Sequence, residues 1–140
     1  MNWQEQAATS HYQTAVAIKQ ELGKGHVDEA KAGIEELVDA LSRAERRALK
    51  SQLVRLMAHV LKWKTQPHKR SRSWAATIRS ARNDIRDIQE DTPSLTDDVI
   101  RSIWDGCFEA AKDQAVSEID EEVTGASLSW DEVFEVDYRV

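Results

Sequence analysis

The sequence predicts an all-α protein, a single-domain bundle of about five mostly antiparallel helices with a short C-terminal helical appendage. Only five glycines and two prolines occur among 140 residues, whereas strong helix formers such as Ala, Leu, Glu, Lys, Gln and Arg are abundant. Apolar residues recur at steps of three and four along the chain. The connections are short, which favours antiparallel neighbours. One core is usual at this length, so residues 1–123 are expected to form the bundle and 124–140 the appendage of one domain.

Two helices are expected in the N-terminal third of the chain. The first spans residues 3–22 and is closed by Gly23-Lys24-Gly25. The second spans about 27–41, where apolar residues form one stripe along the helix. That stripe consists of Val27, Ala30, Ile34, Leu37, Val38 and Leu41.

A third helix is predicted from Arg43 to about Lys64. Ser42 precedes Glu45 by three residues, the capping-box spacing in which each side chain satisfies a free backbone N–H. The inner face of this helix carries Leu49, Leu53, Leu56, Val60 and Trp63, widened by Met57 and Leu61. Pro67 ends it, because proline lacks a donor and disfavours helix at the preceding residue.

A fourth helix, capped by Ser71 or Ser73, is predicted to stop near Asp91. Its apolar residues are spaced four and three apart, a heptad-like stripe of Trp74, Ile78, Ala81, Ile85 and Ile88.

A long fifth helix, capped by Ser94 or Thr96, is predicted to reach about Val123 and to be ended by Thr124-Gly125-Ala126. Its wide apolar arc indicates a central helix with several neighbours. The arc consists of Val99, Ile100, Ile103, Trp104, Cys107, Phe108, Ala110 and Ala111.

The appendage carries a second capping-box spacing, between Ser129 and Glu132. Residues 130–136 are therefore predicted to form a short helix that docks through Trp130 and Phe134.

Charge is segregated along the chain. The net charge is −6, yet residues 62–82 contain seven Lys and Arg and no acid. Residues 87–140 contain 16 acids and three bases. A uniformly solvated surface would not separate charge in this way.

The remaining composition points to a soluble cytoplasmic protein without a cofactor. Cys107 is the single cysteine, which fits a reducing compartment and excludes an internal disulfide. No secretory signal opens the chain, and no apolar run approaches the roughly 20 residues that span a bilayer. Three of the four histidines, His11, His26 and His68, lack metal-ligand spacing with each other or with acids, so no metal site is expected.

The basic segment, defined as residues 62–82, has two interpretations. Lys62, Lys69, Arg70 and Arg72 alternate with tryptophans and could neutralise phosphates while the rings stack on bases. However, Trp63 and Trp74 both fall on inward stripes, so we expect both rings to be buried. The cations would then form a solvated corner or pair with the acidic half of the chain.

Arg82 and His59 flank inward-facing stripes. A half-buried Arg82 needs a carboxylate or several carbonyls to offset its desolvation. A structural ion pair with an acid from another helix is favoured over an anionic ligand. No polarising partner is implied for His59, so a boundary histidine is favoured over a general base.

Enzyme signatures are missing from the sequence. There is no glycine-rich phosphate loop, no G-x-S-x-G turn and no H-E-x-x-H motif. Arg55 and His59 are separated by three residues, too few for the pattern of small helical ribonucleases. Catalysis around His59 and Arg82 is therefore a remote alternative, and no catalytic residue is assigned.

The run from residue 59 to 82, H-V-L-K-W-K-T-Q-P-H-K-R-S-R-S-W-A-A-T-I-R-S-A-R, resembles the signature of a bacterial family called domain of unknown function number twenty-nine. Members read roughly H-L-L-K-W-x-x-x-P-x-x-R-S-x-S-W-x-x-T-I-x-x-x-R. The matching residues are His59, Lys62, Trp63, Pro67, Arg70, Ser71, Ser73, Trp74, Thr77, Ile78 and Arg82. Further matches are Leu41, Glu45-Arg46-Arg47, Leu49 and Pro93-Ser94-Leu95.

The resemblance covers about Leu41 to Val123 and is faint around Ser129-Trp130. The N-terminal part departs from the family pattern at Ala30, Lys31, Gly33 and Leu37, and matches it at Glu36 and Asp39. The resemblance implies an all-helical bundle from a bacterium or its phage, and it brings no established activity.

The leading functional hypothesis is a protein-interaction or regulatory module, such as an antitoxin, immunity protein or inhibitor, whose acidic C-terminal half engages a basic partner. A nucleic-acid-binding role through the basic segment is the alternative, and homo-oligomerisation is left open. The candidate contact residues are His59, Lys62, Lys69, Arg70, Arg72 and Arg82. The residues expected to hold the motif together are Trp63, Pro67, Ser73, Trp74, Thr77 and Ile78.

Overall fold

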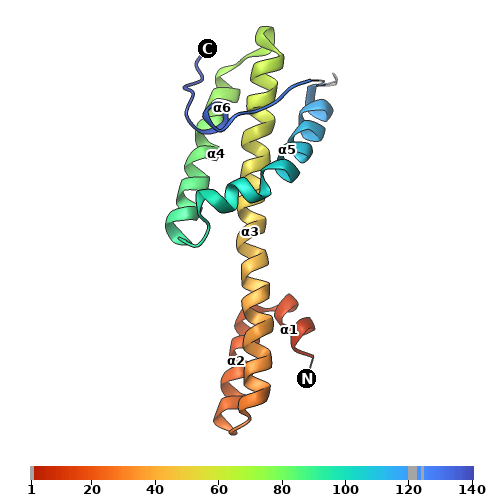
Figure 1. The fold of residues 1–140 in the computed structure, drawn as a ribbon, viewed down its shortest axis with the longest axis vertical. Helices are drawn as coiled ribbons and strands as arrows, with labels where there is room; N and C mark the ends of the chain where they lie inside the picture. Colours follow the sequence, from red (N-terminus) through yellow and green to blue (C-terminus); the bar gives the residue numbers. More distant parts are fainter. Residues whose placement is uncertain (1, 120–122, 124) are drawn as a thin grey trace. The chain divides into compact units, whose positions relative to one another are not determined.

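The computed structural model describes residues 2–119, 123 and 125–140, and every regular element within them is helical (Figure 1). The prediction of an all-α protein is therefore confirmed. The elements are α1 (Trp3–Thr9), α2 (His11–Gly23), α3 (Val27–Thr65), the 3₁₀ turn η1 (Pro67–Lys69), α4 (Arg72–Asp91), α5 (Asp97–Ile119) and α6 (Trp130–Phe134).

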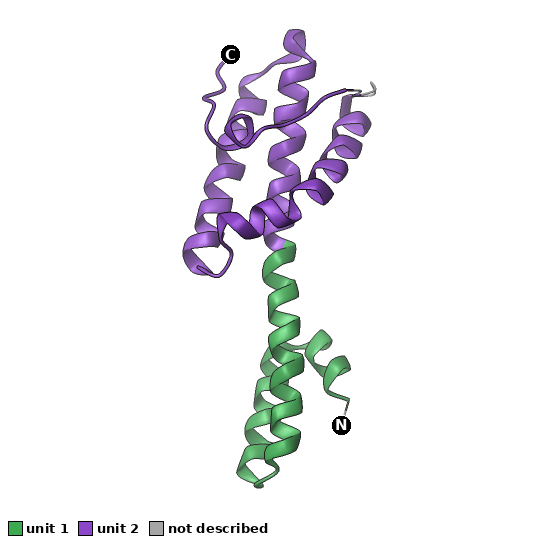
Figure 2. Cartoon of the chain, in the orientation of Figure 1, with its two compact units in different colours: residues 1–47 green, residues 48–140 purple. Residues whose placement is uncertain are grey.

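The chain forms two compact units, residues 1–47 and residues 48–140 (Figure 2). Unit 1 contains α1, α2 and the first part of α3, and unit 2 contains the rest of α3 with α4, α5 and α6. The boundary between the two units falls inside α3.

The predicted first helix is wrong in one respect, because it is broken at Ser10. The backbone of Ser10 is extended, with φ −155° and ψ 116°, and this residue separates α1 from α2. Its hydroxyl accepts a hydrogen bond from the N–H of Gln13 at 3.1 Å, and its carbonyl accepts the Thr14 hydroxyl at 2.7 Å. Ser10 is thus the N-cap of a new helix, a role that serine fills well.

The predicted break at Ser42 is also wrong, because α3 runs without interruption for 39 residues. A Ser-x-x-Glu spacing stabilises a helix start only where the backbone N–H groups are free, that is, where the preceding residues are not helical. The residues around Ser42 are mostly Ala, Leu, Arg and Glu, with no glycine or proline to interrupt the helix. The same spacing therefore occurs here inside a helix.

Unit 1 has a small core of its own. Trp3, Ala17, Ile18 and Ala30 are buried together, with Leu37 packed against them. Gly33 allows this close approach, since a Cβ atom there would lie 2.7 Å from Ile18 Cγ1 and 2.9 Å from the Trp3 ring.

The apolar stripe predicted on residues 27–41 is only partly buried by this core. Ala30 is buried and Leu37 is partly buried. The other four members, Val27, Ile34, Val38 and Leu41, are exposed. Packing within unit 1 therefore leaves one side of α3 bare.

Unit 2 holds the main core, and its α3 face is as predicted. The seven side chains assigned to that face are all at most 5% exposed: Leu49, Leu53, Leu56, Met57, Val60, Leu61 and Trp63. They pack with Ile78, Ala81 and Ile85 of α4, whereas Trp74 and Ile88 at the ends of that stripe are partly buried. Ser71, one of the two proposed caps, begins α4 by accepting the N–H of Trp74.

The helix predicted from Ser94 or Thr96 is α5, and the Thr96 hydroxyl accepts the N–H of Val99 at 3.4 Å. The predicted end near Val123 and the stop at Thr124 touch residues 120–122 and 124, which lie outside the described residues. Val123 itself is buried and not helical.

The C-terminal segment, defined as residues 125–140, belongs to unit 2 and packs against its core. Its capping box between Ser129 and Glu132 is present, and α6 ends at Phe134 rather than at residue 136. Val133 is fully buried, while the two predicted docking residues, Trp130 and Phe134, are half-buried against the same core. The helix therefore docks with Val133 at its centre.

Candidate functional site

The sequence motif occupies the turn from α3 into α4. Pro67 begins the single 3₁₀ turn η1 between these helices, and Ser71 caps α4. Because the turn is short, side chains from the last turns of α3 and the first turns of α4 lie close to one another, as Lys62 and Trp74 do.

Lys62 is the most unusual residue of the motif, because it is a lysine with only 5% of its surface exposed. Its ammonium group forms an ion pair with the carboxylate of Glu118 on α5. It also lies 3.4 Å from His59 Nε2 and 5.2 Å from the centre of the Trp74 ring. A buried charge needs this kind of compensation. Trp74 therefore shields the ion pair rather than filling the centre of the core.

The surroundings of His59 favour the neutral imidazole. Its Nδ1 lies 2.9 Å from the Arg55 carbonyl, which fits a proton on Nδ1 and a lone pair on Nε2 facing the Lys62 ammonium. Burial lowers the pKa of His59, and the neighbouring Lys62 lowers it further, against the raising effects of the Arg55 carbonyl and Glu118. A protonated His59 would place two cations side by side.

Stability is therefore expected to fall as the pH drops below about 6.5, the ordinary pKa of histidine. The unfolded chain takes up this proton at a higher pH than the folded chain does, so acid favours unfolding. A second loss is expected below about 4.5, because Lys62 and Lys64 lower the pKa values of their partners Glu118 and Glu132. Urea unfolding at about pH 7.5 and about pH 5.5 measures the first loss. His59→Gln should reduce that loss, and an unchanged pH dependence would contradict the assignment.

Arg82 binds the C-terminal segment. Its Nε donates to the Val133 carbonyl at 2.8 Å and its Nη2 to the Glu132 carbonyl at 3.3 Å. The guanidinium also lies 5.5 Å from the centre of the Tyr138 ring. The carbonyl partners considered for Arg82 are thus present, whereas the favoured ion pair with an acid of another helix is wrong, since no such pair involves Arg82 among the described residues. Burial lowers the pKa of Arg82 from its usual high value.

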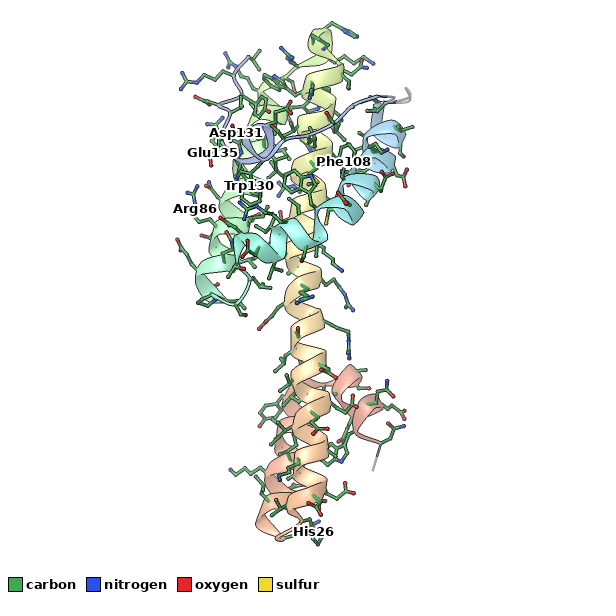
Figure 3. All side chains as sticks on the ribbon, viewed as in Figure 1. His26, Arg86, Phe108, Trp130, Asp131 and Glu135 are labelled. Atoms are coloured by element: carbon green, nitrogen blue, oxygen red, sulfur yellow. The ribbon has the colours of Figure 1, made fainter. Side chains whose placement is uncertain are left out.

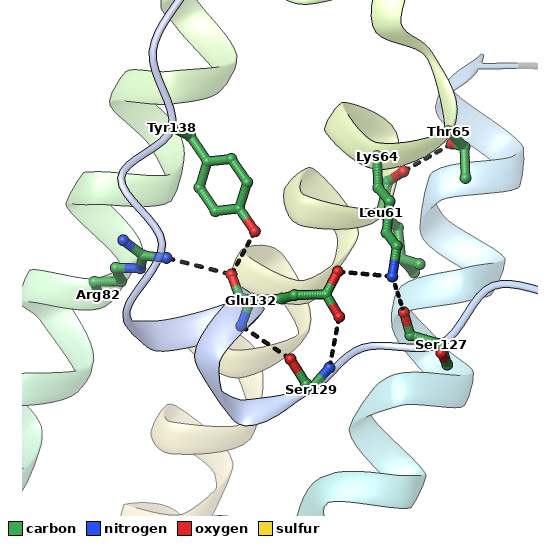
Figure 4. Close-up of polar contacts among 8 residues, drawn as sticks. All are labelled: Leu61, Lys64, Thr65, Arg82, Ser127, Ser129, Glu132 and Tyr138. Carbon is green, nitrogen blue, oxygen red and sulfur yellow. Dashed lines mark hydrogen bonds and ion pairs between the residues drawn. The ribbon is translucent and has the colours of Figure 1, made fainter.

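Glu132 is the centre of this network (Figure 4). Its carboxylate accepts the N–H of Ser129 at 3.0 Å and pairs with Lys64 Nζ at 2.7 Å. Its backbone carbonyl accepts the Tyr138 hydroxyl at 2.6 Å in addition to Arg82. Lys64 also donates to the Ser127 carbonyl at 2.8 Å. One residue thus caps α6 and fastens it to both α3 and α4.

Trp63 completes the attachment of the C-terminal segment. Its ring meets Tyr138 edge to face at 5.5 Å, and the Arg70 guanidinium lies 5.1 Å from the ring centre. Arg70 Nε donates to the Trp63 carbonyl at 2.8 Å. Arg70 is therefore a structural side chain, although it is exposed.

The interpretation that basic residues pair with the chain's own acidic half is confirmed for Lys62 and Lys64. Ile78 is buried and Thr77 is half-buried, while Pro67, Ser73 and Lys69 are exposed. The motif therefore splits into an inward part that holds α5 and the C-terminal segment, and an outward part.

The outward part includes an open basic groove of about 540 Å³ between α4 and the last residues of the chain. Arg72 and Arg79 line it from α4, and Arg139 and Tyr138 from the C-terminal segment. Asp137 also lines the groove, and Arg139, Arg79 and Arg82 lower the pKa of its carboxyl, with Arg139 the strongest influence.

A second surface lies on the acid-rich half of the chain. Trp104, Trp130 and Phe134, here called the aromatic cluster, are half-buried and packed together. Trp104 and Trp130 stack with ring centres 5.7 Å apart, and Phe134 lies 4.5 Å from Trp130. Figure 3 shows Trp130 beside Asp131 and Glu135 at α6.

Exposed carboxylates border the aromatic cluster. Asp97 and Glu135 line one shallow pocket of about 200 Å³ together with Trp130, Phe134 and Arg86. Asp97, Asp131 and Glu135, here called the acidic rim, are all exposed.

The aromatic faces on this surface already accept cations from the chain itself. Arg101 lies 4.5 Å from the Trp130 ring centre and Lys112 lies 5.3 Å from that of Phe108.

Several of these residues were missed by sequence reasoning. Glu118, Lys64 and Tyr138 carry no motif of their own. Their partners, Lys62, Ser127 and Trp63, are each at least 56 residues away in the sequence. The charge segregation was the one available signal, since it indicated attraction between the two halves without naming pairs.

Among the described residues, no helix combines the length and apolar character that crossing a membrane requires. Within the same part of the chain, no three His, Cys, Asp or Glu side chains gather closely enough to hold a metal ion.

Comparison with known proteins identifies a family and no individual relative. No curated protein and no solved structure matches the chain. The family described as Domain of unknown function DUF29 matches residues 13–138, a wider range than the central motif alone. The match spans nearly the whole chain and includes the motif and all but the last two residues of the C-terminal segment that the motif holds. The chain belongs to the DUF29 family.

Proposed function

We propose that this protein is an interaction module of the bacterial cytoplasm that binds a basic segment of a partner protein on its acid-rich half. The observation that carries the proposal is the aromatic cluster bordered by the acidic rim. Half-exposed tryptophans and phenylalanines are typical anchors of protein interfaces, and carboxylates around them attract and orient a basic partner. A regulatory role, such as that of an antitoxin or inhibitor, fits the same surface.

The chemistry of the cluster favours a cationic ligand side chain. Arg101 stacks on Trp130 while its guanidinium also meets Asp98 at 3.1 Å. An arginine or lysine of a partner would find the same two features, an aromatic face and a nearby carboxylate. Arg101 is 58% exposed, so it can move aside for such a group.

Affinity capture with matched variants tests this proposal. The full chain is immobilised, exposed to a lysate of host cells, and each retained protein is then purified and tested for direct binding. A basic protein should bind the parent, and Trp130→Ala should weaken it by about 2 kcal/mol, roughly thirtyfold, as for an interface anchor. Asp131→Asn with Glu135→Gln should weaken binding at low salt most, because rim charges act mainly on encounter.

The control is Asp87→Asn with Glu90→Gln, which removes the same charge from exposed positions on α4 that line none of the grooves described above. This variant should bind like the parent. If the parent and all three variants retain the same protein equally, the acidic rim and aromatic cluster are not the binding surface.

A nucleic-acid-binding role is the second candidate, and the basic groove is the observation that favours it. Arg72 and Arg79 lie seven residues apart on α4, two turns along one side, and could follow a phosphate backbone. The neighbouring acids oppose that role. An electrophoretic shift with generic DNA and RNA at about 0.15 M salt, where screening acts over about 8 Å, compares the two candidates. Tight binding that Arg72→Ala with Arg79→Ala abolishes would favour the nucleic-acid role.

A further inference from the structure

Unit 1 carries an apolar surface that none of the described residues cover. Six of the eight large hydrophobic side chains exposed in the described chain lie in this unit. Four of them, Val27, Ile34, Val38 and Leu41, form one stripe on α3, here called the bare stripe. Their exposures range from 39% to 57%. Apolar side chains gathered in this way mark an interaction surface.

The spacing of the bare stripe fits a helical partner. Its residues are separated by seven, four and three positions, the pattern with which one helix packs along another. At about 1.5 Å per residue the stripe is about 21 Å long. Leu22, at the end of α2, is 50% exposed and adds to the apolar surface close to Val27 in the chain.

The charges beside the stripe are distributed so that they complement a reversed copy of themselves. Asp28 and Glu35 directly follow the stripe residues Val27 and Ile34, so both border the stripe on the same side. Arg46 lies 18 residues after Asp28, five full helical turns, and therefore on that side as well. All three side chains are exposed.

The same polarity holds for the whole of this part of α3. Residues 28–39 contain five acids and one base, whereas residues 43–47 contain three arginines and one acid. A parallel copy would place like charges opposite each other. An antiparallel copy places the acidic part of each helix beside the arginines of the other.

We propose that unit 1 is a homodimerisation unit, in which the bare stripe packs against the same stripe of a second copy running antiparallel. The interface is isologous, so each contact occurs twice about a twofold axis. Pairing Asp28 with Arg46 of the other copy places this axis near Val38, with Ile34 opposite Leu41 and Val27 at the end of the contact. The apolar stripe supplies the stabilisation and the flanking charges set the direction. Since this surface belongs to unit 1, the inference does not depend on the function proposed for unit 2. The dimer would present two copies of the acidic rim and aromatic cluster.

Sedimentation equilibrium of the full chain tests the dimer. Over a series from low to high micromolar concentration, the parent should approach twice its chain mass of 15.9 kDa. Ile34→Glu with Val38→Glu should raise the dissociation constant at least about tenfold, because charges would enter an apolar contact. Both positions are exposed, so far-UV circular dichroism should be unchanged.

The matched control is Ala32→Glu, at an exposed position on another side of α3. It should dimerise like the parent. A parent that remains a single chain throughout the concentration series would overturn the proposal, as would equal dimerisation of the control and the stripe variant.

Cross-linking tests the direction. In a Cys107→Ala background, which removes the only native cysteine, Val38→Cys lies beside its own copy near the twofold axis and should form a disulfide readily. Val27→Cys should not, because antiparallel packing places the two copies at opposite ends of the interface. Efficient cross-linking through position 27 would overturn the antiparallel arrangement.

Discussion

Replacing Trp63 with alanine is expected to lower the free energy of unfolding by about 3–5 kcal/mol, the usual cost of truncating a buried tryptophan. Trp63 is 5% exposed and belongs to the core of unit 2. Its ring also contacts Tyr138 and the Arg70 guanidinium, so truncation leaves a cavity and removes two aromatic contacts. Urea unfolding followed by circular dichroism measures the loss.

The same substitution should loosen the C-terminal segment before the chain unfolds. Tyr138 would lose its aromatic partner, although it would keep its hydrogen bond to the Glu132 carbonyl and its contact with Arg82. Limited proteolysis should therefore cut the variant within residues 125–140 faster than the parent.

Trp74→Ala is the control for this prediction. Trp74 belongs to the same motif but is half-buried, so its truncation should cost clearly less than that of Trp63. If Trp63→Ala unfolds at the urea concentration of the parent, the ring does not hold the core as the packing indicates.

The parts of the fold that the sequence predicted correctly are those where local signals agree. On α4, Ser71 provides a cap, the apolar residues keep one period, and Pro93 follows the end. At α6, the capping box gives the start of the helix correctly, although the helix ends at Phe134 and docks through Val133. Agreement between capping, periodicity and packing therefore fixes α4 fully and only the beginning of α6.

The errors at Ser10 and Ser42 have one physical origin. Serine stabilises a helix start where the backbone leaves the helix, and is tolerated within a helix elsewhere. At Ser10 the chain turns so that α1 and α2 can both contact the core of unit 1. At Ser42 no such contact requires a turn, and α3 continues. The outcome depends on tertiary packing, which a capping pattern does not contain.

The candidate site could be predicted only as a set of residue types. The burial of Trp63 and the need of Arg82 for backbone or acidic partners follow from positions on a helical stripe. The burial of Lys62 does not, because lysine is rarely buried and its partner Glu118 lies 56 residues away. The aromatic cluster and the acidic rim could not be predicted either, since charge counts do not reveal which acids lie beside which aromatic rings.

Removing the Glu118 carboxylate is the second large effect, and it should exceed the effect of removing Lys62. Among the described residues, Glu118→Ala leaves the buried Lys62 ammonium with His59 Nε2 and the Trp74 ring as partners. Losing one member of a fully buried pair costs about 3–5 kcal/mol, and because the Glu118 side chain is 41% exposed we expect a smaller loss, about 2–3 kcal/mol.

Lys62→Met should cost less, within about 1 kcal/mol, because methionine fills the same space without a charge and the partly exposed Glu118 can turn to water. In the double variant, Glu118→Ala should then add little to Lys62→Met, since no buried charge remains to be compensated. Urea unfolding of the parent, both single variants and the double variant completes the cycle. If the two single changes instead cause equal losses that add up in the double variant, Lys62 and Glu118 are not coupled. The ion pair would then not be what stabilises the buried Lys62 ammonium.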